Sequence, residues 1–188
     1  MNRHRLAAAA VIILETAALS TLSACAKEYP PTTQGPSVRA FCEPFLKFFQ
    51  EDLTINDVSL RSADNLDAKI SDLDSVACNY AGKLDNPVRA IVGLESPQSD
   101  VVHPDAAQRE VLGYKRLPGY SVDIWIRDNR IKESTSSKGS LDLTVAVDDW
   151  HVSLQILAAD KSLEMTDEQV SRAAELLIER TESVTALG

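Results

Sequence analysis

The sequence is poor in several residue types on which common functional sites depend. Aromatic residues make up 5% of the 188 residues, and the chain has seven glycines and three cysteines. With so few aromatics the core must be mostly aliphatic, and an aromatic-lined ligand groove is not expected. The glycines form no phosphate-cradling cluster, and three cysteines leave little room for a zinc ribbon. The remaining composition, 44% hydrophobic and 25% charged, is typical of one globular domain.

Positive charge is also scarce. Lys and Arg number 19 against 28 Asp and Glu, a formal net charge of −9. A protein that binds nucleic acid needs clustered Lys and Arg to contact phosphates. A nucleic-acid partner is therefore not expected.

Catalytic motifs are missing as well. The sequence contains no nucleophile elbow, zinc-protease motif or Walker loop. After residue 24 the histidines are His103 and His151, and the one carboxylate near His103, Asp105, does not complete a three-ligand metal site. A surface loop is the favoured interpretation of His103. We expect no enzymatic activity, no cofactor and no metal.

Residues 1–24 have the pattern of a signal peptide. Arg3 and Arg5 are basic, and an apolar run from Leu6 to Leu14 follows. This run is shorter than the roughly 20 residues that span a bilayer, and Glu15 after it disfavours a spanning helix further. A cleaved leader is therefore predicted.

The end of this segment resembles the lipobox of bacterial lipoproteins, Leu-[Ala/Ser]-[Gly/Ala]-Cys, because it reads Leu22-Ser23-Ala24-Cys25. The resemblance implies that Cys25 carries a diacylglycerol group and is the first mature residue; paired acyl chains such as palmitate anchor a protein stably. Residues 25–36, with three prolines, are then a tether, and 37–188 form a single domain outside the cytoplasmic membrane. Loss of the leader changes the net charge to −10, so we expect the domain to stand off an anionic lipid surface.

Lipidation of Cys25 leaves Cys42 and Cys78 in an oxidising compartment. An even pair of cysteines in such a compartment predicts a disulfide. A free, buried pair is the alternative.

Hydrophobic periodicity predicts an α+β domain. Apolar residues at helical spacing indicate a helix over 37–53, and a capping box from Thr166 to Gln169 begins another over 167–185. Alternating apolar residues predict five strands, at 76–80, 88–94, 120–126, 141–147 and 150–156. We therefore expect an antiparallel sheet of about five strands, with the N- and C-terminal helices packed on one face.

The pairing of the last two predicted strands has the clearest register. A two-residue turn at Asp148-Asp149 pairs Val147 with Trp150 and places Trp150 beneath the helices. The acid-rich segment 56–74 predicts a short helix on a solvated face, and a second short helix is expected near 104–112.

Two residues on the other face of the predicted sheet are candidates for partner binding. His151 points to this open face by parity, and Trp125 is a large aromatic on the same side. Either Trp125 belongs to a binding surface or another part of the chain covers it, with residues 100–115 the favoured cover.

Taken together, the chain resembles a family of uncharacterised actinobacterial lipoproteins of unknown function. The matching features are Cys25, Cys42 in Phe-Cys-Glu-Pro, Cys78 in Ala-Cys-Asn-Tyr, the hairpin around Trp150 and the C-terminal helix. The family implies no known reaction, and similar lipoproteins occur as accessory subunits of envelope complexes.

Three functions follow as hypotheses. The first is a lipid-anchored module that binds a protein partner in the cell envelope. The second is a small-molecule or lipid sensor with its ligand between helix 38–53 and the sheet, and an envelope hydrolase is the third. A cavity of about 300 Å³ or more under that helix favours the sensor, whereas a filled core with an exposed apolar patch favours the partner-binding module.

Overall fold

The structure is a computed structural model that describes residues 35–82, 88–130, 139–158 and 164–186. The chain divides into two compact units, residues 1–30 and 31–188, and the described residues all belong to the second. The predicted signal peptide, Cys25 and nearly all of the tether lie outside the described residues.

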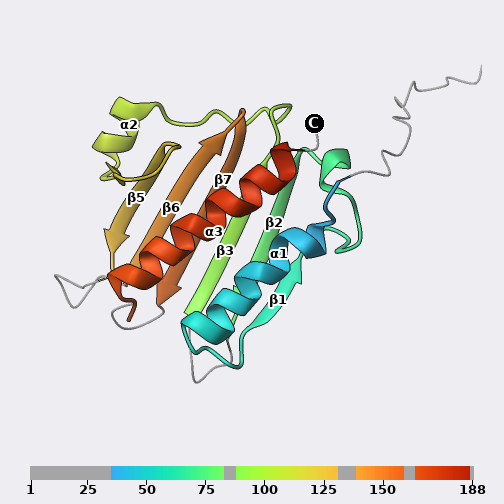
Figure 1. The fold of residues 1–188 in the computed structure, drawn as a ribbon, viewed down its shortest axis with the longest axis horizontal. Coiled ribbons are helices and arrows are strands. Elements are labelled where there is room, and N and C mark those ends of the chain that lie inside the picture. Colours follow the sequence, from blue (N-terminus) through green and yellow to red (C-terminus); the bar gives the residue numbers. More distant parts are fainter. Residues whose placement is uncertain (1–34, 83–87, 131–138, 159–163, 187–188) are drawn as a thin grey trace, which may run out of the picture. The chain divides into compact units, whose positions relative to one another are not determined.

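A seven-stranded antiparallel sheet forms the centre of this unit, with the order β1-β2-β3-β7-β6-β5-β4 (Figure 1). The strands are β1 (Ser59–Ser62), β2 (Ser75–Ala81), β3 (Val88–Glu95), β4 (Lys115–Arg116), β5 (Ile124–Asn129), β6 (Ser140–Val147) and β7 (Trp150–Ala158). Each strand pairs with its sequence neighbour within β1–β3 and within β4–β7, and β3 pairs with β7. The sheet is thus two meanders joined edge to edge.

The helices are α1 (Val38–Lys47), the π-helical turn η1 (Phe48–Asp52), the 3₁₀ turn η2 (Ile70–Asp72), α2 (Ala106–Val111) and α3 (Asp167–Thr185). α3 contacts β6 and β7, whereas α1 contacts β1 and β2. Figure 1 shows α1 and α3 crossing the same side of the sheet. No helix among the described residues is both long and apolar enough to cross a membrane.

The α+β class and the antiparallel sheet are confirmed, but the sheet has seven strands instead of about five. The additional strands, β1 and β4, are short and lie at the two edges. The helix expected within 56–74 is wrong: β1 and the single turn η2 occupy this segment. Ser62 and Asn65 accept hydrogen bonds from backbone amides two residues ahead, and such local bonds compete with a helix.

The β6–β7 hairpin has the predicted register, with Val147 opposite Trp150 and Val145 opposite Val152. Asp148 and Asp149 form the turn with φ of 48° and 66°. Positive φ at both central residues is the type I′ geometry that matches the twist of a hairpin. Trp150 packs against the core and remains partly exposed beside this turn.

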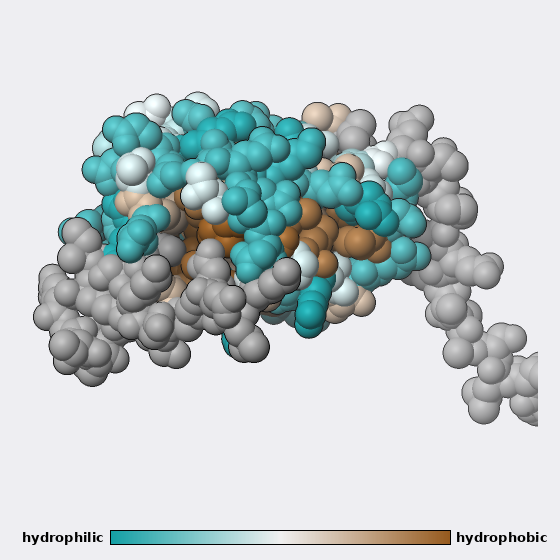
Figure 2. Space-filling view, turned by 90° about the horizontal axis from the view of Figure 1, so that it is seen from below, coloured by the Kyte–Doolittle hydropathy of each residue, from teal (hydrophilic) through white to brown (hydrophobic). Residues whose placement is uncertain are grey.

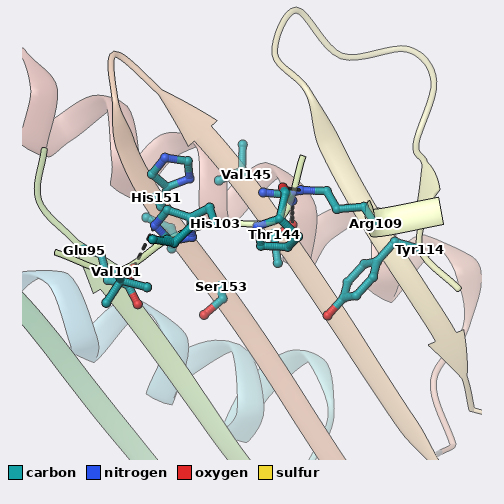
Figure 3. Close-up of a pocket in the computed structure, with 12 residues that line it drawn as sticks. Glu95, Val101, His103, Arg109, Tyr114, Thr144, Val145, His151 and Ser153 are labelled. Carbon is teal, nitrogen blue, oxygen red and sulfur yellow. Dashed lines mark hydrogen bonds and ion pairs between the residues drawn. The ribbon is translucent and has the colours of Figure 1, made fainter. Parts of the chain in front are cut away.

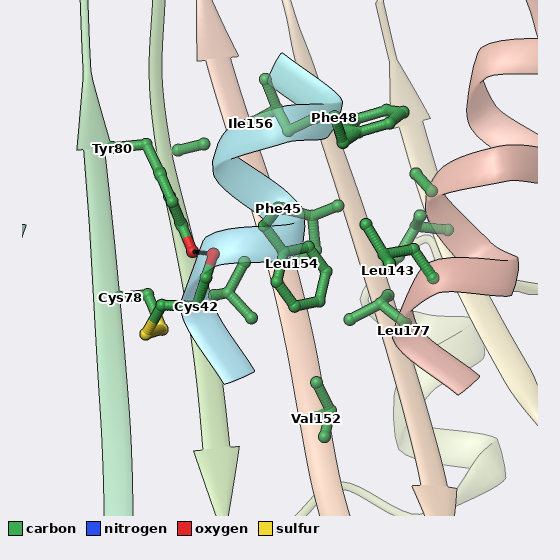
Figure 4. Close-up of a cluster of buried hydrophobic side chains, with 14 of the residues drawn as sticks. Cys42, Phe45, Phe48, Cys78, Tyr80, Leu143, Val152, Leu154, Ile156 and Leu177 are labelled. Atoms are coloured by element: carbon green, nitrogen blue, oxygen red, sulfur yellow. Dashed lines mark hydrogen bonds between the residues drawn. A yellow bond between two sulfur atoms is a disulfide. The ribbon is translucent and has the colours of Figure 1, made fainter. Parts of the chain in front are cut away.

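The hydrophobic core lies between the helices and the sheet, and its aromatic part comes from α1 and η1. The π-helical turn widens the helix, and both Phe48 and Phe49 are buried there. Cys42 of α1 is disulfide-bonded to Cys78 of β2, which confirms that predicted pair, and the Tyr80 hydroxyl donates to the Cys42 carbonyl at 2.8 Å (Figure 4). Seen from one edge, hydrophobic side chains form a band between hydrophilic surfaces (Figure 2).

Candidate functional site

The segment that joins the two meanders, residues 96–114, carries α2 and supplies several side chains to the open face of the sheet. A capping box begins α2, because the Asp105 side chain accepts from the Gln108 amide and the Gln108 side chain accepts from the Asp105 amide. The Arg109 Nε donates to the Pro104 carbonyl at 2.9 Å. These bonds fix the start of the helix and the direction of the Arg109 side chain.

His151, one of the two predicted binding residues, is stacked on His103 from this segment. Their ring centroids are 3.6 Å apart with 18° between the ring planes, and His103 Nε2 lies 2.9 Å from Glu95 Oε2. Burial lowers the pKa of His151, and the nearby His103 and Arg109 lower that pKa further. His103 lies in a loop, as expected, and is half-buried where it stacks on His151.

Trp125, the other predicted binding residue, is covered within the chain. Only 9% of Trp125 is exposed, and the Arg109 guanidinium carbon lies 5.8 Å from its ring centroid. β4 pairs Arg116 with Trp125 along the sheet edge. This result agrees with the alternative that residues 100–115 cover it. Trp125 therefore offers little surface to a partner, and its tentative role in partner binding stays a prediction.

A pocket of about 220 Å³ opens beside the stacked histidines (Figure 3). Thr144 of β6 and Ser153 of β7 line the side formed by the sheet, and Arg109 and Tyr114 approach from the joining segment. The Arg109 guanidinium donates to the Thr144 hydroxyl. Burial lowers the pKa of Arg109, although the group stays charged at any physiological pH.

An ion pair between buried Asp142 and half-buried Arg127 lies beside the wall of the pocket that Tyr114 forms. Asp142 is buried and accepts from the Arg127 guanidinium at 3.0 Å and from Gln155 Nε2 at 2.7 Å. The Arg127 guanidinium carbon in turn lies 5.0 Å from the centroid of the Tyr114 ring. Burial raises the pKa of Tyr114, the charge of Asp142 raises that pKa further, and Arg127 and Arg109 oppose this effect.

An apolar surface lies on the outside of the same segment. Val102 is 92% exposed and Val111 is 88% exposed, and Val101 and Leu112 are also exposed. A shallow hollow of about 600 Å³ is lined by Val102, His103, Pro104, Ala107, Gln108, Val111 and Leu112. We name the four exposed residues, Val101, Val102, Val111 and Leu112, the α2 patch.

The space between α1 and the sheet is filled. Phe41, Phe45 and Phe49 are buried, with ring centroids 5.7 Å apart for Phe41 and Phe45 and 4.9 Å apart for Phe49 and Tyr80. Side chains thus occupy the place where the sensor hypothesis put a ligand. A filled core together with an exposed apolar patch is the arrangement expected for the partner-binding module.

A metal centre does not fit the stacked histidines. The nitrogen lone pairs of each histidine lie in the plane of its own ring, and the two ring planes are nearly parallel. The two rings therefore cannot both direct a nitrogen at the same ion. Within the described ranges, no three His, Cys, Asp or Glu side chains are grouped as metal ligands.

No protein-family model, curated protein or solved structure matches this chain. The resemblance to two-cysteine lipoproteins stays a prediction. The sequence could place His151 on the open face by parity, but it contains no signal that brings His103 and Arg109 to the same place. Their approach depends on the course of the joining segment.

Proposed function

We propose that the protein is a lipid-anchored, extracytoplasmic module that binds a protein partner of the cell envelope through the α2 patch. The observation that carries this proposal is the exposure of Val102 and Val111, at 92% and 88%. Exposed apolar residues around a hollow, here Val102, Val111 and Leu112, are typical of interaction sites, because water contact with them is unfavourable. The proposed activity is binding and not catalysis.

The charges around the α2 patch indicate what kind of partner it fits. Asp100, Asp105 and Glu110 are exposed in the same segment, and the whole chain has a formal net charge of −9. A partner that inserts apolar side chains between the valines and carries Lys or Arg at the rim is complementary to this surface.

The proposal includes the expectation that α1 and α3 cover one apolar face of the sheet and leave the other face for binding. The contacts of α3 with β6 and β7, and of α1 with β1 and β2, support it. The lipobox ending at Cys25 supports the anchor and the location at the outer face of the cytoplasmic membrane.

The test is purification from detergent-solubilised membranes, compared between variants. We expect a partner that co-purifies with the wild type to be lost from the double variant Val102→Gln/Val111→Gln. Ile91→Gln is the matched control, because Ile91 is 43% exposed on β3 outside the α2 patch. Equal recovery of the partner with both variants would contradict the proposal. If the co-purifying protein is a second copy of this chain, the α2 patch is a homodimer interface and the proposed envelope partner is wrong.

A further inference from the structure

Positive groups gather in the open-face pocket of a chain that is acidic overall. Arg109, His103 and His151 all line it, whereas Glu95 is the one carboxylate among the lining residues. Glu95 lies 2.9 Å from His103 and balances that single group. With Arg109 charged and His151 protonated, the pocket therefore has an excess of positive charge.

Arg109 is the fixed charge of this cluster. It donates hydrogen bonds to the neutral oxygens of Pro104 and Thr144, and the charge of Asp123 acts on it without an ion pair among the described residues. A half-buried guanidinium that forms no ion pair retains the capacity to bind an anion, because its planar donors suit two oxygens at once.

We propose that this pocket binds a small oxyanion, a carboxylate or a phosphate, between Arg109 and protonated His151. The hydroxyls of Thr144, Ser153 and Tyr114 line the same space and supply further hydrogen-bond donors (Figure 3). The cavity of about 220 Å³ limits the bound group to a small molecule or the charged end of a larger one. Val101 and Val102 of the α2 patch also line this pocket, so the two proposed sites adjoin.

Binding of the anion is linked to protonation of His151. The charged groups that act on His151 are His103 and Arg109, which oppose its protonation, and Asp149, which favours it. A bound anion offsets the repulsion from His103 and Arg109, so it raises the pKa of His151. By reciprocity, acidification through that pKa strengthens anion binding.

The experiment is an NMR titration of the purified full-length protein with acetate at about pH 7.5 and about pH 5.5, above and below the ordinary histidine pKa. We expect saturable shifts at Arg109 and His151, tighter binding at the lower pH, and a higher His151 pKa in the presence of acetate. Inorganic phosphate in a parallel titration distinguishes the two oxyanions, and phosphatidylglycerol vesicles distinguish a lipid headgroup from a free ligand.

Arg109→Gln removes the fixed charge and should weaken acetate binding at least tenfold. Arg116→Gln is the matched control, because Arg116 is an exposed arginine on neighbouring β4. His151→Asn tests the site without altering α2, and its acetate affinity should lose its dependence on pH. Absence of saturable shifts in the wild type, or equal affinities of the Arg109 and Arg116 variants, would overturn the proposal.

Discussion

At the scale of single residues, the titration of His151 should make the stability of the folded protein depend on pH. Its pKa is lowered by burial and by His103 and Arg109, so the folded state resists protonation of this ring. The unfolded chain then binds the proton more readily, and the free energy of unfolding falls as pH drops below about 6.5. Urea unfolding in buffers free of carboxylate and phosphate should show this loss between about pH 7 and about pH 5.

The variant His151→Asn removes the titrating group and should flatten this pH dependence. Asp128, whose pKa is lowered mainly by its hydrogen bond to Arg130, loses stabilisation at more acidic pH and does not affect the same window. If the free energy of unfolding of the variant depends on pH as steeply as that of the wild type, groups other than His151 cause the dependence.

Only part of the candidate site could be predicted from the sequence. Alternation along β7 placed His151 on the open face, since parity follows from the pleat of a strand. The stacking with His103 could not be predicted in this way. It depends on a joining segment with no periodic pattern, whose course is set by its contacts with the sheet.

At the scale of elements, the β6–β7 hairpin turn offers a direct test. Asp149 has φ of 66°, a conformation that costs most L-residues about 1–2 kcal/mol and glycine very little. Asp149→Gly should raise the free energy of unfolding by about 0.5–1 kcal/mol, and Asp149→Val should lower it by about 1–2 kcal/mol. Asp149→Asn is the control, with little expected change because Asn tolerates this conformation. Chemical denaturation measures all three.

The elements that sequence predicts well are those with a strong local signal. The hairpin has eight alternating apolar residues, and α3 begins at the predicted capping box, where the Gln169 amide donates to the Thr166 hydroxyl. β1 and β4 lack such a signal. β4 has two residues, and β1 is held by its pairing with β2, a long-range contact that spacing does not reveal.

At the scale of the whole molecule, lipid attachment at Cys25 is the main expectation from the sequence. Intact-mass measurement of protein purified from membranes should show loss of residues 1–24 and the added mass of a diacylglyceryl group. Cys25→Ala should lack this added mass, because it has no thiol to carry the lipid. Recovery of wild-type protein without lipid at Cys25 would contradict the predicted lipid anchor. The description of the folded domain does not depend on this result.

The central proposal is that the α2 patch contacts a protein partner of the cell envelope. The most direct measurement is site-specific photo-crosslinking in intact membranes, with the crosslinker at position 102 in one sample and at position 91 in another. The account predicts a discrete crosslinked product from position 102, which is 92% exposed in the patch, and none from position 91 on β3. Products of equal yield from both positions, or from position 91 alone, would contradict it.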